Sequence, residues 1–476
     1  MSAVRAFGMH DQRWFAARSG DWNPLHVDPL AARRLLFGGP VVHGIHLTAW
    51  AVNSILAELG CVGRIGRLRV KFESPLLVGA TAVVQTLAAV PEEIQLRVVS
   101  GRPLASITLN IDKERAAGDG ANLSSNAPCA SVPLEKGMDE MCDASGSLPA
   151  FHLAPDVAPA FPHLHEMLGE AGTSVLLASS RLVGMECPGL HSIFGSLDVA
   201  FSNESGDAVL RYSVERADPR ISMLTIGFGG YGARGQIRVF MRPAPARQPS
   251  TQELSQLTAS DEFAYHKVLV IGGSRGLGEV TAKLVATGGG EVILTYYRGA
   301  EEASRIVADI ERAGGNASAI QLDVTESADA VQKALAPLDS LTGVFFFAAP
   351  KISLGKPGSF NSELFSQFCD LFVAMPCALA AEISSRCRPG ALLFYPSTVF
   401  LDRPGEGGAE YCAAKAAGEA AWREFGKAYP KHRFVAERLP RLRTDQTASL
   451  QGAPAPEAAP ALLNVLRKHL TAASAT

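Results

Sequence analysis

The sequence predicts a multidomain protein that combines α+β and α/β architecture, and three observations support this prediction. Residues 42–59 form one nearly continuous apolar segment, and runs of alternating apolar and polar residues follow it. Residues 151–242 show a similar order. From Lys267 onward, strand-like and helix-like segments alternate regularly. A chain of 476 residues is long enough for about two to four domains.

Residues 1–113 are expected to contain one buried helix and an antiparallel sheet. Only Gly44 and Asn53 interrupt the apolar character of residues 42–59, and a helix that is apolar on most faces is a buried one. The runs with strand periodicity are residues 67–73, 80–87, 94–100 and 105–111. Turn residues separate these runs, as expected for strands. A sheet wrapped around one central helix is the hot-dog arrangement.

Residues 151–242 are expected to form a second hot-dog that pairs with the first as a double hot-dog. Residues 164–182 can form its helix, although Gly169 and Gly172 interrupt them. Strand-like runs follow at residues 195–201, 208–214, 221–227 and 235–241.

Residues 262–450 are expected to form a Rossmann-like doubly wound parallel sheet. The apolar strand that begins at Lys267 runs into a glycine-rich loop, and a helix follows as far as Thr287. Further strands are expected at residues 291–297, 321–325 and 343–349. Glycines permit the tight turn, and the N-terminus of the helix attracts a pyrophosphate.

Two stretches are expected to connect these parts. Residues 114–150 are rich in small and polar side chains, which predicts a long surface connection. Residues 243–261 contain several prolines and a polar run, which predicts an interdomain linker.

Composition argues against several classes of protein. The net charge is −3, and no basic patch suggests nucleic-acid binding. No apolar run is expected to reach the ~18–20 residues that span a bilayer, and the N-terminus lacks a signal peptide. The eight cysteines are scattered without a Cys-x-x-Cys pair, which argues against a metal site and against disulfides. We therefore expect a cytoplasmic enzyme without a membrane partner.

The most informative stretch is Phe15 to His26. It places the carboxylate of Asp21, the amide of Asn23 and the imidazole of His26 on a turn-rich segment that is not expected to be the interior of a helix. A proton donor and a proton acceptor five residues apart suit the addition or removal of water across a double bond.

This stretch resembles the MaoC-like, or (R)-specific hydratase 2, signature, and residues 37–44 resemble the entry into that family's central helix. The resemblance implies that Asp21 and His26 are the acid/base pair, in either assignment. Asn23 is expected to orient the loop or bind substrate. The Gly44 amide is expected to polarise a thioester carbonyl. The second hot-dog lacks this motif, although it contains His163, His165 and His191, so we expect it to shape an acyl pocket without catalysing. Double hot-dog hydratases carry the motif in their C-terminal half, so its N-terminal place here is a departure.

A second set of candidate residues lies near the C-terminus. Tyr411 and Lys415 are four residues apart and share a helix face, and an ammonium beside a phenol lowers the phenol's pKa. Ser397 can hold the substrate oxygen while Tyr411 transfers the proton. With the glycine loop, this pattern resembles the short-chain dehydrogenase/reductase family. The resemblance implies that Asp323 and Val324 lie by an adenine and that Lys415 also touches the nicotinamide ribose.

The expected cofactor is NADP(H). No acid follows the second strand of the Rossmann-like sheet, where one would bind the ribose of NAD. Arg275 and Arg298 can instead pair with a 2′-phosphate. The full set of residues expected to bind the cofactor is Gly272, Ser274, Arg275, Gly276, Leu277, Gly278, Arg298, Asp323, Val324, Tyr411 and Lys415.

Three departures from the reductase pattern bear on activity. Phe346-Phe347-Ala348-Ala349 replaces the family's Asn-Asn-Ala-Gly, Phe372 stands near the position of the relay Asn, and Pro440-Arg441 replaces a Pro-Gly.

Together, the two resemblances imply a bifunctional enzyme. The chain is expected to reduce a 3-ketoacyl thioester with NADPH and to dehydrate the 3-hydroxyacyl product to a trans-2-enoyl thioester, in fatty-acid-like or polyketide-like biosynthesis. The acyl group is expected to arrive on coenzyme A or an external carrier protein, and the reductase domain is a candidate for homo-oligomer formation. One alternative is the reverse flux of β-oxidation. Another is a dehydratase whose reductase-like domain is only a scaffold.

Overall fold

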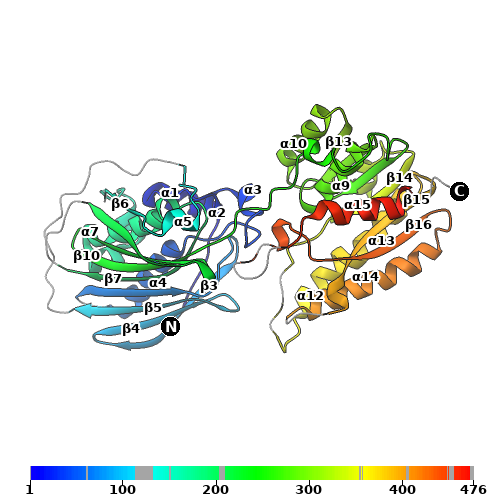
Figure 1. The fold of residues 1–476 in the computed structure, drawn as a ribbon. Helices are drawn as coiled ribbons and strands as arrows, with labels where there is room; N and C mark the ends of the chain where they lie inside the picture. The colour runs from blue at the N-terminus through cyan, green and yellow to red at the C-terminus, as the bar shows by residue number, and fades with distance from the viewer. Residues whose placement is uncertain are drawn as a thin grey trace. The chain divides into compact units, whose positions relative to one another are not determined.

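The computed structural model describes residues 2–60, 63–112, 132–149, 152–202, 209–352, 355, 357–403, 407–447, 449 and 455–471. The chain divides into two compact units (Figure 1). Unit 1 comprises Met1–Ala244 with Ser449–Gly452, and unit 2 comprises Pro245–Ala448 with Ala453–Thr476. The predicted combination of α+β and α/β parts is confirmed.

Unit 1 is built on one ten-stranded sheet in the order β1-β3-β4-β5-β2-β7-β10-β9-β8-β6. All of its strand pairs are antiparallel, and β2 pairs with β7 to join two five-stranded halves. The strands are β1 (Ser2–Ala6), β2 (Arg64–Phe72), β3 (Thr81–Val90), β4 (Glu93–Val99), β5 (Pro103–Asp112), β6 (Ser145–Leu148), β7 (Ser192–Phe201), β8 (Leu210–Asp218), β9 (Met223–Gly230) and β10 (Ala233–Met241).

Each half of unit 1 supplies one long helix to a shared apolar core. The helix α4 (Gly44–Leu59) belongs to the first half and α7 (Pro162–Arg181) to the second, and the two pack against each other. Gly169 has a φ of 71° and interrupts the helical backbone of α7. The sheet curves around this pair (Figure 1). The predicted double hot-dog is therefore present.

The shorter elements of unit 1 lie around these two helices. They are α1 (Met9–Ser19), α2 (Pro24–Val27), α3 (Pro29–Ala32), α5 (Met138–Met141), α6 (Val157–Ala160), the π-helix η1 (Leu182–Glu186) and the 3₁₀ helix η2 (Pro219–Ile221). One of them, α5, falls where a connection was predicted, and so does the strand β6. In the described part of residues 114–150, α5 is helical and β6 pairs with β8; residues 113–131 and 150 lie outside the described chain.

Unit 2 contains a six-stranded, fully parallel sheet in the order β13-β12-β11-β14-β15-β16. The strands are β11 (Lys267–Ile271), β12 (Glu291–Tyr296), β13 (Asn316–Gln321), β14 (Leu341–Phe346), β15 (Cys387–Thr398) and β16 (Arg433–Leu439). The order reverses between β11 and β14, and this reversal is where doubly wound sheets bind nucleotides. The predicted Rossmann-like sheet is confirmed.

Helices cover both faces of this sheet, and two large apolar clusters separate them from the strands. The helices of unit 2 are α8 (Thr251–Leu254), α9 (Gly276–Thr287), α10 (Ala300–Arg312), α11 (Ala328–Leu335), α12 (Ser362–Cys369), the π-helix η3 (Asp370–Ala374), α13 (Met375–Ser384), the 3₁₀ helices η4 (Val399–Leu401) and η5 (Asp445–Thr447), α14 (Ala409–Lys427) and α15 (Ala458–His469). The helix α15 packs on α9, so unit 2 extends beyond residue 450.

One helical stretch contradicts an expectation from the sequence. Residues Ser362–Ser384, which span α12, η3 and α13, are long and apolar enough to cross a membrane by length and composition. Leu379, Ala380 and Ile383 of this stretch are buried in the core under the parallel sheet. A core helix of a soluble protein passes the same test, so the stretch is weak evidence for a membrane span.

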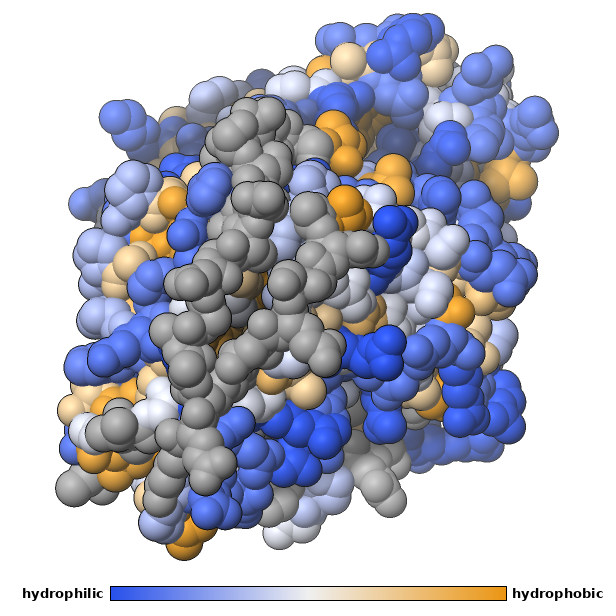
Figure 2. All heavy atoms as spheres, turned by 90° about the vertical axis from the view of Figure 1, so that its left-hand side faces the viewer, coloured by the Kyte–Doolittle hydropathy of each residue, from blue (hydrophilic) through white to orange (hydrophobic). Residues whose placement is uncertain are grey.

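The surface of unit 1 that Figure 2 presents is predominantly hydrophilic. Its hydrophobic side chains form small separate groups among the atoms that are coloured by hydropathy, without a single broad apolar patch on that face.

Candidate active sites

The first site is built where α1 ends and α4 begins. Gly20 ends α1 with a φ of 76°, a left-handed conformation that glycine adopts without strain. Asn23 then caps α2, and its Oδ1 accepts a hydrogen bond from the Leu25 N–H at 3.0 Å. The segment from Phe15 to His26 is thus more helical than expected: Phe15 lies in α1 and His26 in α2. Asp21 and Asn23 lie in the turn between the two helices, as predicted.

Asp21 is almost fully buried, with 2% of its surface exposed. Its Oδ1 accepts a hydrogen bond from the Asn23 N–H at 3.2 Å, and its Oδ2 accepts one from the Ser180 hydroxyl at 2.7 Å. Both carboxylate oxygens are thereby fixed in direction.

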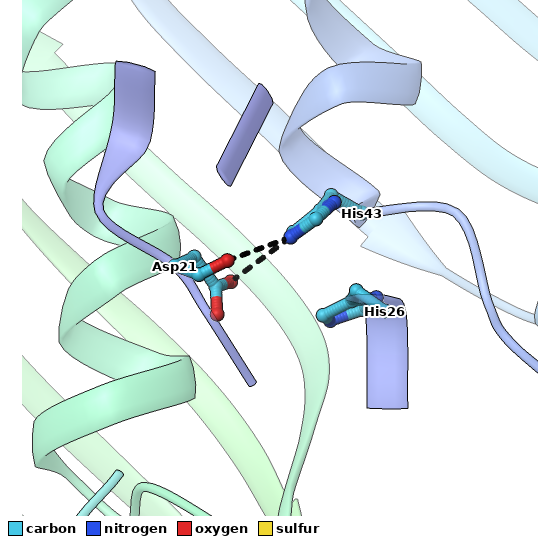
Figure 3. Close-up of side chains that lie close together, drawn as sticks. All are labelled: Asp21, His26 and His43. Atoms are coloured by element: carbon cyan, nitrogen blue, oxygen red, sulfur yellow. Dashed lines mark hydrogen bonds and ion pairs between the residues drawn. The ribbon is translucent and has the colours of Figure 1, made fainter. Parts of the chain in front are cut away.

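His26 lies beside Asp21 and is stacked on His43 (Figure 3). The two imidazole centroids are 3.9 Å apart, and a ring nitrogen or carboxylate oxygen of each of Asp21, His26 and His43 lies within 4.8 Å of the others. The Nδ1 of His26 is 2.7 Å from the Val41 carbonyl oxygen. That contact assigns the proton of neutral His26 to Nδ1 and leaves Nε2 as a base.

His43 contacts both the turn that carries Asp21 and, through Gln12, the helix α1. Its Nε2 is 3.0 Å from the Asp21 carbonyl oxygen, and its Nδ1 is 2.9 Å from Oε1 of the buried Gln12. The Gln12 Oε1 also accepts the His43 backbone N–H at 3.1 Å. Both ring nitrogens of His43 thus face oxygen acceptors, and because burial keeps the pKa of His43 well below its ordinary value, the neutral ring has one N–H to donate to one of them. From the sequence, His43 is only part of the stretch 37–44 that resembles the entry into the central helix, and no motif indicates Gln12.

Burial changes the proton affinities of the pair in opposite directions. It raises the pKa of the Asp21 carboxyl above its ordinary value and lowers the pKa of His26. The buried environment thus favours a neutral carboxylic acid next to a neutral imidazole. One of these groups can donate a proton and the other can accept one.

Gly44 opens α4 beside this pair. The first N–H groups of a helix have no partner within the helix, and the positive end of the helix dipole favours negative charge. A Cβ on Gly44 would lie 2.8 Å from the Phe72 ring, so only glycine fits there. The role of the Gly44 amide toward a thioester carbonyl stays a prediction.

The second half of unit 1 completes the site. Ser180, on α7, donates to Asp21, and the Asn23 amide nitrogen donates to the carbonyls of Gly184, Gly189 and Leu190 at 2.9, 3.2 and 3.2 Å. A Cβ on Gly184 would lie 2.1 Å from Asp21 Oδ1. Asn23 therefore orients the loop, the first of its two predicted roles.

None of the three histidines singled out in the second half joins the trio. His191 is 3.1 Å from Glu135 Oε1, and the His163 backbone N–H bonds to Asn53. His165 lies 3.4 Å from the Thr173 hydroxyl.

The second site lies at the carboxyl ends of the strands in unit 2. Gly272 and Gly276 have φ values of 78° and 59°, and α9 begins at Gly276. A Cβ on Gly272 would lie 2.6 Å from the Ala348 nitrogen, and one on Gly278 would lie 2.3 Å from the Gly272 oxygen. These glycines form the strand–loop–helix turn that leaves room for a pyrophosphate.

The residues at the end of β12 form a small polar group. Arg298 stacks on the Tyr297 ring at 4.6 Å and donates to the Tyr297 hydroxyl at 3.0 Å. Asp323 accepts hydrogen bonds from the Thr325 N–H and hydroxyl at 2.9 and 2.6 Å. Arg275 directly precedes α9 as its N-cap residue. Arg298 is exposed, so its guanidinium is accessible to a phosphate.

The predicted Ser–Tyr–Lys set is only partly brought together. Ser397 donates to Glu419 Oε1 at 2.5 Å, whereas Tyr411 shares a hydrogen bond with Thr398, the next residue along β15. The hydroxyl beside Tyr411 is therefore that of Thr398, which corrects the assignment of Ser397. Successive side chains of a strand point to opposite faces, so an error of one residue turns the hydroxyl away from the site.

The pKa values of Tyr411 and Lys415 are both set mainly by burial. Burial raises the pKa of Tyr411 to about 12, so the predicted lowering is wrong. Burial lowers the pKa of Lys415 to about 7. The Lys415 ammonium donates to the Pro396 carbonyl at 2.7 Å and lies 4.2 Å from the centroid of the Phe372 ring.

Phe372 occupies the region where a relay amide was expected. It is buried in the π-helix η3, and its carbonyl accepts a hydrogen bond from the Tyr395 hydroxyl at 3.0 Å. An apolar ring and an occupied carbonyl therefore replace a hydrogen-bonding side chain next to Lys415.

The chain is similar to two protein families. Residues 5–98 match the MaoC like domain, and residues 266–449 match the short chain dehydrogenase family. Over 111 residues, the chain is 34% identical to the (R)-specific enoyl-CoA hydratase of Aeromonas caviae. The matched segment covers 22% of this chain and 75% of that protein.

Unit 2 has relatives of its own. It is 30% identical over 167 residues to the 2,5-dichloro-2,5-cyclohexadiene-1,4-diol dehydrogenase LinX of Sphingobium indicum, covering 33% of this chain and 64% of that protein. A short chain dehydrogenase from Burkholderia cenocepacia, solved with NADP, is 22% identical with a TM-score of 0.38, covering 43% of this chain and 90% of that one. The chain thus spans less than two thirds of the length of the LinX dehydrogenase.

The chain therefore belongs to the MaoC-like family through its N-terminal unit, and residues 266–449 of its C-terminal unit are similar to the short chain dehydrogenase family.

Proposed function

We propose that the protein processes the β-carbon of an acyl thioester with two activities. Unit 1 removes water from a 3-hydroxyacyl thioester to give a trans-2-enoyl thioester, and unit 2 forms the 3-hydroxyacyl group by NADPH-dependent reduction of a 3-ketoacyl thioester. The observation that carries the proposal is the pairing of buried Asp21 with half-buried His26 beside His43, the N-cap residue of α4. The named activity of the Aeromonas relative supports the same chemistry for unit 1.

The geometry suggests how the dehydratase pair divides its work. Neutral His26, protonated at Nδ1, offers Nε2 as the base that takes the α-proton. Protonated Asp21 gives its proton to the β-hydroxyl, which leaves as water while the Cα–Cβ double bond forms. The next cycle begins after His26 loses and Asp21 regains a proton. The Gly44 amide and the dipole of α4 favour the negative charge that develops on the thioester oxygen.

The residues of unit 2 fit NADP(H). The glycine turn before α9 leaves room for a pyrophosphate, and Arg275 and Arg298 suit the 2′-phosphate. NADP(H) supplies or accepts a hydride when it is bound. Tyr411, next to the Thr398 hydroxyl, is placed to exchange a proton with the substrate oxygen. Joining both activities in one chain raises the local concentration of the shared 3-hydroxyacyl intermediate.

Product analysis tests this proposal. The protein is incubated with 3-ketoacyl thioesters of coenzyme A and of a carrier protein, with NADPH or NADH, and the products are identified by mass. We expect the enoyl product with NADPH, and no reduction by Tyr411→Phe. Fluorescence titration is expected to show tighter binding of NADPH than of NADH, and Arg298→Gln should weaken that preference. Equal affinity for the two cofactors in the unmodified protein would contradict the assignment of Arg298.

A second candidate function is a dehydratase whose unit 2 serves as a scaffold. The environment of Lys415 favours it, because Pro396, Phe372 and Tyr395 surround the amine without a relay amide. This reading predicts water elimination without NADPH oxidation above the Tyr411→Phe background. Product analysis therefore separates the two candidates.

A further inference from the structure

A buried arginine borders the dehydratase site and has no role in the mechanism above. Arg242 follows β10 and is 3% exposed. Among the residues that the structure describes, no carboxylate lies within 4.0 Å of its guanidinium, and its Nε has no hydrogen-bond partner. A buried charge without a paired counter-charge is costly. A contribution to stability therefore does not explain why the Arg242 guanidinium is buried.

The contacts of Arg242 connect it to the catalytic loop. Its Nη2 donates to the Leu190 carbonyl at 2.5 Å, and the amide nitrogen of Asn23 donates to the same oxygen at 3.2 Å. Its Nη1 lies 3.5 Å from His191 Nδ1, and its backbone N–H donates to the His191 carbonyl at 2.8 Å. Arg242 thus fixes one of the three carbonyl acceptors that hold the Asn23 side chain.

The charge of Arg242 also acts on His26. Three titratable groups face His26 from the surrounding elements: Asp21 from its own loop, His43 from the start of α4 and Arg242 from the end of β10. Asp21 favours the imidazolium, whereas Arg242 opposes it. Burial lowers the pKa of Arg242 itself to about 10, so the guanidinium remains charged at neutral pH.

We propose that Arg242 is a positioning residue of the dehydratase site, which clamps the catalytic loop through the Leu190 carbonyl and sets its positive charge beside that loop. The proposal rests on the dehydratase function proposed above. It assigns a role to the second half of unit 1 that no motif in that half indicates. It also gives a reason for a buried guanidinium without a carboxylate partner.

The test compares kcat/KM against pH for dehydration of a short 3-hydroxyacyl thioester of coenzyme A, the direction in which His26 acts as the base. Arg242→Gln removes the charge and the clamp, so the acid limb of the profile should move to higher pH and kcat/KM should fall by up to ~100-fold, mainly through kcat. Arg242→Lys keeps the charge, so its acid limb should stay in place while its rate falls. Arg238→Gln, which alters an exposed arginine of the same strand, is the matched control and should leave both unchanged.

A second readout does not depend on activity. Histidine-labelled protein is titrated by NMR, with the His26 signal identified through His26→Gln, and the pKa of His26 should rise in Arg242→Gln. Unmodified protein without dehydratase activity would remove the proposed function and this inference with it. An active protein whose profile and His26 titration are unchanged in Arg242→Gln would overturn the inference alone. If Arg242→Gln does not fold, a displaced acid limb in Arg242→Lys overturns it.

Discussion

Replacing Gly184 by alanine should disable the dehydratase site without touching a catalytic side chain. Gly184 lies in η1, and a Cβ there would sit 2.1 Å from Oδ1 and 2.7 Å from Oδ2 of Asp21. Real Cβ atoms essentially never approach another atom closer than 3.0 Å. The carboxylate must therefore retreat by roughly 1 Å, a displacement that can cost about 100-fold in rate.

The same displacement weakens the contacts that orient the carboxylate. Oδ2 accepts from the Ser180 hydroxyl at 2.7 Å and Oδ1 from the Asn23 N–H at 3.2 Å, so neither bond survives a retreat of that size unchanged. Overpacking a filled interior also costs ~1–3 kcal/mol of stability. We expect Gly184→Ala to lower kcat for hydration of a trans-2-enoyl thioester by about 100-fold or more, together with a lower unfolding midpoint.

Gly8→Ala is the matched control. It also places a methyl group next to an aspartate, but its Cβ would lie 3.7 Å from Asp11 Oδ2, an ordinary contact. Hydration by Gly8→Ala should stay close to that of the unmodified protein. Near-normal hydration by a folded Gly184→Ala variant would refute the placement of the Asp21 carboxylate, because the two groups cannot occupy the same space.

Three further predictions concern the proton-transfer groups. Asp21→Asn and His26→Ala should each lower dehydration by at least ~100-fold while leaving NADPH affinity unchanged, as measured by product analysis and fluorescence titration. Thr398→Ala should lower NADPH-dependent reduction more than Ser397→Ala does, since Thr398 bonds to Tyr411 and Ser397 bonds to Glu419; the reverse order would restore the assignment of Ser397. Burial lowers the pKa of Lys415 from 10.5 to about 7, so the unfolded chain binds the extra proton between these values and stability should rise with pH across this window. Lys415→Met should remove that rise in denaturant midpoints, and an unchanged pH dependence would place the amine in water.

The fold was predictable wherever periodicity was strong. The apolar segment at 42–59 became α4, and the alternating runs after it became β2 to β5. The elements that were missed carry weak patterns. The helix α1 is largely polar and buries Gln12 and Ser19, and β6 is the four-residue stretch Ser-Gly-Ser-Leu. Their structure depends on tertiary contacts that local composition does not record.

The candidate sites were predictable only where a motif carries them. Asp21, Asn23 and His26 belong to one recognisable run and lie together as expected. Ser180 and Gly184 carry no motif of their own, because they reach Asp21 only through the packing of α7 and η1 beside the first half. In unit 2, the glycine spacing specified the turn before α9. The choice between the adjacent hydroxyls of Ser397 and Thr398 required knowing which face of the sheet each side chain of β15 points to.

The dehydratase site is larger than the segment that resembles a dehydratase. The MaoC match ends at residue 98, yet Asp21 is bonded to Ser180, and Asn23 donates to three carbonyls between Gly184 and Leu190. Two contributions from the second half are hydrogen-bonding groups: the Ser180 hydroxyl donates to Asp21, and the three carbonyls accept from Asn23. A third, the missing Cβ of Gly184, is space that the Asp21 carboxylate occupies. The second half therefore acts by holding Asp21 and Asn23 in position, which is consistent with its lack of an acid/base motif of its own, and the proposed active site of unit 1 is built from both hot-dogs.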